Sequence, residues 1–180
     1  MELTARLGPG ESLGDRVLKV NHAGEHGAVN IYRGQALASR LRAPSLIAEL
    51  REFQAHEEGH RALFWHELEQ RGRRRCRSYH LCGIGGYVLG VVTGLIGPSA
   101  VAATTVAVER VVLRHLAVQL QVLEDIDPKG HAAVLAIVKD ERQHHESAAL
   151  ATRQGAFWPR VLMPVVSVTT EVVIWLGMRL

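Results

Sequence analysis

The chain has 180 residues and a formal net charge of +3, and 47% of its residues are hydrophobic while only 5% are aromatic. This length suits one domain with a full core, and small aliphatic side chains suit closely packed helices. The mild positive charge is compatible with an anionic membrane surface and is too weak to indicate nucleic-acid binding, so we expect no nucleic-acid partner. Cys76 and Cys82 have neither zinc-site nor thioredoxin-type spacing and are expected to be reduced thiols.

The first half of the chain predicts a helical hairpin. Residues 1–15 contain Pro9, Gly10 and Gly14 and are expected to form a loose lead-in, with acidic residues that argue against a signal peptide. A first helix is predicted from Asn21, as its N-cap, to about Leu41. Residues 42–45 predict a turn, and Ser45 is the expected cap of a second helix that continues to about residue 70.

The crossover over residues 71–97 begins with five arginines in seven positions. This basic loop over 71–77 is either a solvated connection or a contact with anionic lipid headgroups. Residues 81–108 then contain no charged residue and no histidine, which is long enough to raise the question of a transmembrane helix. Because Gly97-Pro98 interrupts this run, we predict a separate apolar helix over 83–96 and a bundle helix over 98–123. A membrane-crossing helix over 83–96 remains the alternative.

The last third predicts two more helices. Asp127-Pro128 has the form of a cap followed by a proline at the first helical position, and this helix is expected to end near residues 153–155. Residues 159–178 predict a final apolar helix. Such a helix either covers the core or lies in a membrane interface.

One pattern of acids and histidines occurs twice along these helices. The first copy is Glu25 followed by Glu57-x-x-His60, and the second copy is Glu109 followed by Glu141-x-x-His144. In both copies the second glutamate lies 32 positions after the first. Residues three apart on a helix share a face, so each Glu-x-x-His presents a carboxylate and an imidazole together. A predicted turn lies about midway between the two glutamates of each copy. Each hairpin is therefore expected to bring its two glutamates to the same height along the bundle axis.

A glutamate from each of two helices, with Glu-x-x-His from each of the other two, is the ligand set of di-iron or di-manganese carboxylate bundles. We therefore predict an all-α, ferritin-like four-helix bundle with a di-iron carboxylate site and two extra apolar helices, in a single domain over residues 1–180. Carboxylates with one imidazole per metal suit iron or manganese, and two bridging carboxylates would let six side chains hold two ions. The predicted metal ligands are Glu25, Glu57, His60, Glu109, Glu141 and His144.

Three further residues are candidates for a supporting role. His115 follows Glu109 by six positions, too far round the helix for a direct ligand, and either supports the site or is an ordinary polar residue. Asp140 either contacts a ligand histidine or is exposed. Tyr32, two turns after Glu25, either faces the site or packs in the core.

With these residues in view, the chain resembles the demethoxyubiquinone hydroxylase family of ubiquinone biosynthesis over roughly residues 15–180. The matching stretches are Val20–Glu25, Ile31–Gln35, Glu57–His60, Thr105–Glu109 and Asp140–His145. All six predicted ligands fall on the metal-ligand positions of that family. His115 also matches a family position, which favours a supporting role.

The resemblance implies a membrane-associated di-iron monooxygenase with two iron ions that cycle between Fe2+ and Fe3+. Its substrate would be a demethoxyubiquinone or demethoxyubiquinol, 2-polyprenyl-3-methyl-6-methoxy-1,4-benzoquinone, hydroxylated on the ring with O2 and reducing equivalents from NADH. The implied partners are this polyprenyl quinone, the membrane surface and an accessory lipid-binding protein of ubiquinone synthesis. The implied location is the cytoplasmic face of a bacterial inner membrane, or the matrix side of the mitochondrial inner membrane in a eukaryote.

Two other functions fit the same ligand pattern. A ferritin-like iron-oxidising or iron-storage protein would have no organic substrate, and the apolar helices argue against it. A non-catalytic membrane scaffold would keep the bundle without turnover. No Gly-x-Gly-x-x-Gly fingerprint is present, so we expect no Rossmann-type nucleotide site.

Overall fold

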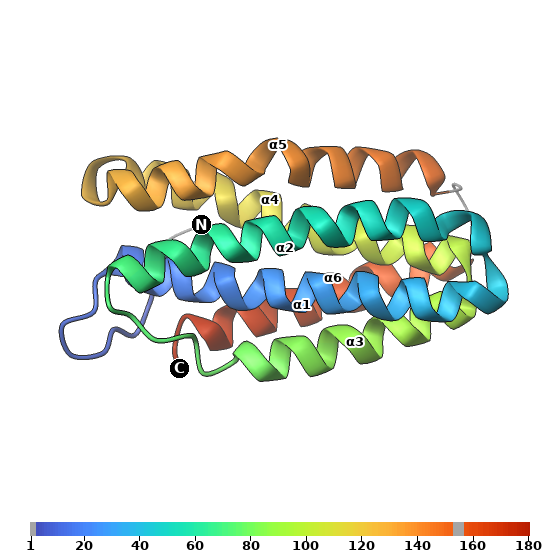
Figure 1. Cartoon of the computed structure of the whole chain (residues 1–180), viewed down its shortest axis with the longest axis horizontal. Coiled ribbons are helices and arrows are strands. Elements are labelled where there is room, and N and C mark those ends of the chain that lie inside the picture. Colours follow the sequence, from blue (N-terminus) through green and yellow to red (C-terminus); the bar gives the residue numbers. More distant parts are fainter. Residues whose placement is uncertain (1–2, 153–156) are drawn as a thin grey trace.

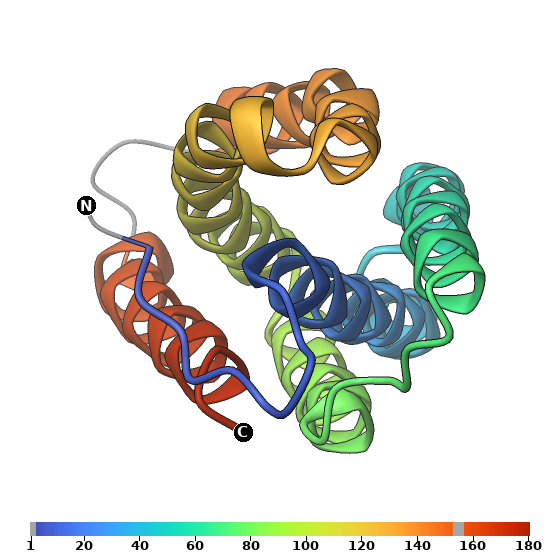
Figure 2. The ribbon, with the colours of Figure 1, turned by 90° about the vertical axis from the view of Figure 1, so that its left-hand side faces the viewer.

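The computed structural model describes residues 3–152 and 157–180, and all regular structure in those residues is helical. Four long helices pair into two antiparallel hairpins, and two further helices lie outside them, α3 against α1 and α6 against α4 (Figure 1). The view along the bundle in Figure 2 places α5 on the opposite side of the molecule from α3. This confirms the predicted all-α, ferritin-like arrangement with two added apolar helices. The elements are α1 (Leu13–Arg42), η1 (Pro44–Leu46), α2 (Ile47–Gln70), α3 (Tyr79–Ile96), α4 (Pro98–Ile126), α5 (Pro128–Ala151) and α6 (Phe157–Gly177).

The first helix begins earlier than its sequence suggested. Ser12 is the N-cap of α1: its hydroxyl accepts a hydrogen bond from the backbone N–H of Asp15, and the Asp15 carboxylate accepts one from the N–H of Ser12. The prediction of a cap at Asn21, after a lead-in over 1–15, was therefore wrong. Asn21 lies inside α1, and its side-chain amide exchanges two hydrogen bonds with Gln119 on α4, at 2.8 and 3.0 Å.

Other boundaries shift by a few residues. Ser45 lies in the 3-10 turn η1 and caps nothing, because the N-cap of α2 is Leu46. Asp127 caps α5 as predicted, with its carboxylate accepting from the backbone N–H of Gly130 at 3.0 Å. α3 starts four residues before position 83, α4 runs three residues past 123, and α6 starts two residues before 159. The predicted end of α5 at 153–155 lies outside the described residues.

Glycines let α3 lie directly on α1. A Cβ atom on Gly86 would stand 2.3 Å from the carbonyl oxygen of Gly27, and one on Gly90 would stand 2.1 Å from that of Ile31. Both distances are impossible, so only glycine permits this approach. At the other end of α3, Gly97 adopts φ +119 and ends the helix before Pro98, as the sequence predicted.

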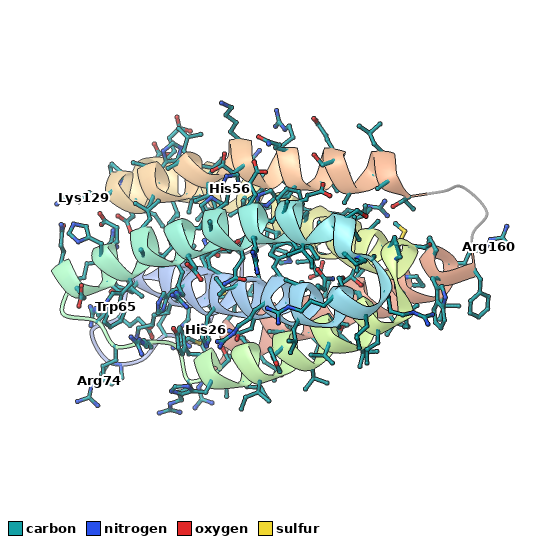
Figure 3. All side chains as sticks on the ribbon, turned by 45° about the vertical axis from the view of Figure 1, so that its right-hand side comes forward. His26, His56, Trp65, Arg74, Lys129 and Arg160 are labelled. Atoms are coloured by element: carbon teal, nitrogen blue, oxygen red, sulfur yellow. The ribbon has the colours of Figure 1, made fainter. Side chains whose placement is uncertain are left out.

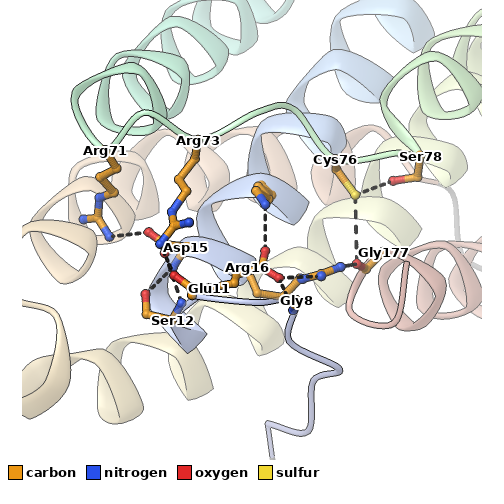
Figure 4. A network of polar contacts seen from close by, with 12 residues as sticks. Gly8, Glu11, Ser12, Asp15, Arg16, Arg71, Arg73, Cys76, Ser78 and Gly177 are labelled. Atoms are coloured by element: carbon orange, nitrogen blue, oxygen red, sulfur yellow. Dashed lines mark hydrogen bonds and ion pairs between the residues drawn. The ribbon is translucent and has the colours of Figure 1, made fainter.

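The basic loop after α2 divides into two parts. Arg73 forms an ion pair with Asp15 at 2.9 Å, and Arg71 contacts Asp15 at 3.5 Å (Figure 4). Arg71 also forms an ion pair with Asp127 at 2.5 Å. These two arginines therefore tie the loop to the start of α1 and to the turn before α5. The remaining arginines of the loop, at positions 74, 75 and 77, are exposed.

Two apolar layers enclose the middle of the bundle. Val17, Leu18, Phe64 and Leu68 belong to a large cluster at one end, together with residues of α4 and α5. A second cluster at the other end includes Tyr32, Leu50 and Phe53. On α1, α2 and α4 the acids and histidines of the repeated pattern lie between the residues of these two clusters along the helix.

Among the residues that the structure describes, two helices are long and apolar enough to cross a membrane, as judged from length and composition alone: α3 and α6. In α3 one side is occupied by α1, and 39% of its apolar window is buried in the protein, whereas the corresponding share for α6 is 11%. Both helices expose rows of large aliphatic side chains, such as Ile84 and Val88 on α3 and Val165 and Val168 on α6.

Candidate metal centre

All six predicted ligands meet in the centre of the bundle. Glu25 comes from α1, Glu57 and His60 from α2, Glu109 from α4, and Glu141 and His144 from α5, and none is more than 6% exposed. Each Glu-x-x-His motif points both of its side chains inward because residues three apart lie on one face. Four carboxylates buried together would repel one another strongly without compensating positive charge.

The six side chains form two overlapping groups. Ligand atoms of Glu25, Glu57, His60 and Glu141 lie within 4.8 Å of one another, and so do those of Glu57, Glu109, Glu141 and His144. Glu57 and Glu141 belong to both groups. They are therefore in position to bridge two cations, each of which would also have one further glutamate and one histidine.

The hydrogen bonding of these atoms fits a bound cation. His60 Nδ1 lies 3.0 Å from Glu141 Oε1, and His144 Nδ1 lies 3.1 Å from Glu57 Oε1. Despite these distances, all four atoms are buried and lack a hydrogen bond of acceptable geometry. Nitrogen and oxygen lone pairs that converge in this way are stabilised by a shared positive partner, and a bound metal ion would supply it.

Each ligand histidine is held through its other ring nitrogen. His60 Nε2 lies 3.2 Å from Asp140 Oδ2, and His144 Nε2 lies 3.0 Å from His56 Nδ1. A hydrogen on Nε2 leaves the lone pair on Nδ1 free to bind a metal. Asp140 thus occupies the supporting position considered for it from the sequence. His56 was assigned no role there, although it precedes Glu57 just as Asp140 precedes Glu141.

Tyr32 also reaches the site. Its buried hydroxyl donates a 2.9 Å hydrogen bond to Glu109 Oε1. Burial and the negative charge of Glu109 raise the pKa of Tyr32 well above 10, so the phenol keeps its proton. Its predicted catalytic role stays a prediction, but Tyr32 faces the ligands and at the same time packs against Phe53.

His115 lies apart from the ligand groups. Its Nε2 atom is 2.8 Å from Glu171 Oε2 on α6, and Glu171 also pairs with Arg114. Burial and the nearby Arg114 lower the pKa of His115 below 6.5. The His115 side chain lines the cavity described in the next paragraph. Any supporting role of His115 would therefore be contact with a molecule bound in that cavity.

A cavity of about 600 Å³ adjoins the ligands. Its walls come mainly from α1, α3, α4 and α6, and its lining includes Glu25, Glu57, Glu109 and Glu141. The wall residues of α3 and α6 are mostly aliphatic, and polar groups are few, among them Asn21, His115 and Gln119. The volume and the mostly apolar lining are typical of a small-molecule site.

Comparison with known proteins identifies one family and several relatives with closely similar names. The family profile described as "Ubiquinone biosynthesis protein COQ7" matches residues 12–177. A Rhodospirillum rubrum protein named 3-demethoxyubiquinol 3-hydroxylase is 34% identical over 92% of this chain and 77% of its own length. The proteins named NADPH-dependent 3-demethoxyubiquinone 3-hydroxylase, mitochondrial, are 32% identical in Dictyostelium discoideum and 30% in Homo sapiens; both matches cover 92% of this chain, and 76% and 77% of the relatives.

Proposed function

The chain belongs to the COQ7 family of ubiquinone biosynthesis proteins, and we propose that it is a di-iron monooxygenase that hydroxylates the ring of a demethoxyubiquinone or demethoxyubiquinol. One observation carries the proposal: the lining of the apolar cavity includes the four glutamates of the candidate metal centre. A molecule bound in the cavity would therefore place its inner end beside the metals. An iron-storage protein has no need of such a cavity.

The six ligands would be Glu25, Glu57, His60, Glu109, Glu141 and His144, and we propose iron as the metal because hard carboxylates with one imidazole each suit it. The bound iron would supply activation of O2. The protein's own contribution is to hold the substrate ring and to keep water out. The aliphatic walls from α3 and α6 suit a polyprenyl tail, and Asn21, Gln119 and His115 are the polar groups that could orient a quinone ring.

The source of electrons is a reduced nicotinamide in this proposal. The resemblance of the sequence implied NADH, whereas the names of the eukaryotic relatives specify NADPH. Rates measured with each nucleotide under otherwise equal conditions would distinguish them.

We further propose that the exposed aliphatic rows of α3 and α6 rest on a membrane, where a polyprenyl quinone resides. The chain would then be a peripheral protein of the cytoplasmic face of a bacterial inner membrane, or of the matrix side in a mitochondrion, with an accessory lipid-binding protein to deliver the substrate. The membrane would lie against the side of the molecule formed by α3 and α6, which also provide walls of the cavity.

Vesicle flotation tests the membrane face. Changing Ile84 and Leu95 on α3 to Glu should reduce co-flotation by about tenfold, since each exposed apolar side chain would enter the interface. The control changes two exposed leucines of α5 to Glu, Leu135 (54% exposed) and Leu150 (91% exposed), and should leave flotation unchanged. Equal behaviour of the two variants would overturn this part of the proposal.

Single-turnover chemistry tests the reaction. The protein is loaded anaerobically with Fe(II), mixed with reduced demethoxyubiquinol and exposed to O2, and the quinone is analysed by mass spectrometry. The proposal predicts a product heavier by one oxygen atom. Iron oxidation without any change in the quinone would support the iron-storage alternative, and absence of bound iron would support the scaffold.

A further inference from the structure

A stack of rings and guanidinium groups lies between α1, α2 and the start of α3. Tyr79 is at its centre: the ring of His26 lies parallel to it with centroids 4.0 Å apart, and that of His22 lies 4.8 Å away. Trp65 follows at 5.3 Å from His22. Figure 3 shows Trp65, His26 and Arg74 on the same side of the bundle. No member of the stack lines the cavity or belongs to either ligand group.

Two arginines are held by this stack. The guanidinium carbon of Arg75 lies 4.6 Å from the ring centre of Trp65 and 4.8 Å from that of Tyr79. Arg61 Nη1 lies 3.2 Å from His26 Nδ1. Because His26 and Tyr79 are themselves in contact, both guanidinium groups border the same pair of rings.

The positive charge of this pair is not neutralised by any carboxylate of the described residues. The ion pairs in that part of the protein include Arg71 and Arg73 but neither Arg61 nor Arg75. Burial, followed by the charges of Arg75 and Arg61, lowers the pKa of His22 to about 4, which is consistent with a positive local potential. Arg75 is exposed and Arg61 half-buried, so a ligand from solution can reach both.

A guanidinium that stacks on a ring keeps its in-plane N–H donors free, and their fork matches the oxygens of a phosphate. Stacking also fixes the side chain before the ligand arrives, which reduces the entropy lost on binding. We propose that Arg61 and Arg75, positioned by Trp65, Tyr79 and His26, form a binding site for a phosphate group. This site lies outside the hydroxylation centre, and its existence does not depend on the proposed reaction.

Two sources could supply the phosphate. The stack adjoins the first turn of α3, whose first exposed large hydrophobic residues are Leu81 and Ile84, so an anionic lipid headgroup is within reach if that face rests on a membrane. A pyridine nucleotide carries phosphates as well. The two sources share the chemistry that Arg61 and Arg75 recognise, and separate arms of one experiment distinguish them.

The experiment uses the full chain and two pairs of substitutions that remove equal charge. Arg61→Gln with Arg75→Gln removes the proposed site, and Arg74→Gln with Arg77→Gln removes two exposed arginines of the same region that lie outside the stack. One arm measures binding to phosphatidylcholine vesicles with and without phosphatidylglycerol. The other measures binding of NADPH by calorimetry. Thermal unfolding of each variant confirms that it is folded.

We expect the first pair to weaken binding of phosphatidylglycerol vesicles or of NADPH by about tenfold and the control pair by no more than about twofold. The probe that responds identifies the source. Arg61→Lys with Arg75→Lys keeps the charge and loses the fork, and should also weaken binding, which keeps the test valid if the glutamine variant unfolds. Equal losses from both pairs, or no loss from the first pair with either probe, would overturn the proposal.

Discussion

The two halves of the metal centre carry the same ligands in different surroundings. Each ligand of the first half lies 84 positions before its counterpart: Glu25 before Glu109, Glu57 before Glu141, and His60 before His144. The positions that touch these ligands do not match in the same way. Position 140 is Asp and supports His60, while the equivalent position 56 is His and supports His144.

The glutamates that belong to only one group differ as well. Glu109 accepts a hydrogen bond from Tyr32 of the other half. The position 84 residues after Tyr32 is Leu116, which cannot donate one to Glu25. The comparison teaches that the repeat specifies which side chains converge, whereas their neighbours make the two groups chemically unequal.

The largest expected effect is a difference in metal content between variants of a glutamate that belongs to both groups and variants of a glutamate that belongs to one group. Glu141→Ala removes a carboxylate of both groups and should abolish binding of both metal ions and hydroxylation, whereas Glu25→Ala should retain roughly one ion per chain. Metal content of the purified variants measures this. Retention of a full pair of ions by Glu141→Ala would refute the shared role.

Replacing either residue that contacts a predicted ligand histidine should affect only the metal position beside that histidine. Asp140→Ala should weaken the metal bound near His60, and His56→Ala that near His144, each by about 10- to 100-fold in affinity. Titration with Co(II) followed by its absorption spectrum resolves the two positions. Asp125→Ala changes an exposed acid in the last turn of α4; it is the control and should alter neither metal position. Identical spectra from the two variants would argue that the halves are equivalent.

The metal-free protein should lose stability as the pH rises. Burial, followed by repulsion from Glu57 and Glu141, raises the pKa of both Glu25 and Glu109 well above 4.5. Burial lowers the pKa of His60, but contacts with Glu141 and Glu57 outweigh it and raise that pKa to about 10. Groups with raised pKa values stabilise the fold fully below their unfolded pKa, and this contribution is lost as the pH rises toward the folded value.

The window for this loss therefore begins near the unfolded pKa values of 4.5 for the glutamates and 6.5 for His60 and extends toward 10. The lowered pKa values of His22, His26 and His115 act in the opposite direction below about pH 6.5. Between pH 7 and pH 9 we therefore expect the melting temperature of the metal-free protein to fall by roughly 5 °C or more. Bound metal keeps the ligands deprotonated, so the loaded protein should show a much flatter profile. A metal-free melting temperature that rises over this range would contradict the assignment.

The smallest expected effect concerns Tyr32. Tyr32→Phe removes one buried hydrogen bond to Glu109 and should lower the free energy of unfolding by about 1–2 kcal/mol. Tyr87→Phe is the matched control, because the Tyr87 hydroxyl forms no hydrogen bond with a described residue, and it should change stability by less than about 0.5 kcal/mol. Denaturant unfolding measures both. An equal effect of the two substitutions would show that the Tyr32 hydroxyl contributes nothing in particular.

The convergence of the six predicted ligands could be foreseen from the sequence because their pattern is local to each helix. The spacing within Glu57-x-x-His60 fixes which face both side chains share, and the position of the turn fixes the height at which Glu25 meets them. Asp127 before Pro128 likewise marked the start of α5 from neighbouring residues alone.

Contacts across the bundle were not predictable in the same way. Asn21 has the chemistry of a helix cap but bonds to Gln119, which is 98 residues away, while Ser12 caps α1 instead. The loop that contains Arg71 and Arg73 was expected to face water or lipid, but both arginines form ion pairs with Asp15. The position of Asp15 depends on where α1 starts, which the sequence did not show. The support of His144 by His56 could have been inferred only from the 84-residue repeat, since it joins α2 to α5.

The most direct test of the account is the iron content and Mössbauer spectrum of the full chain loaded anaerobically with Fe(II). Two overlapping ligand groups with unequal neighbours predict two iron ions per chain in two distinguishable environments. A protein that binds one iron ion or none under these conditions would contradict the shared metal centre.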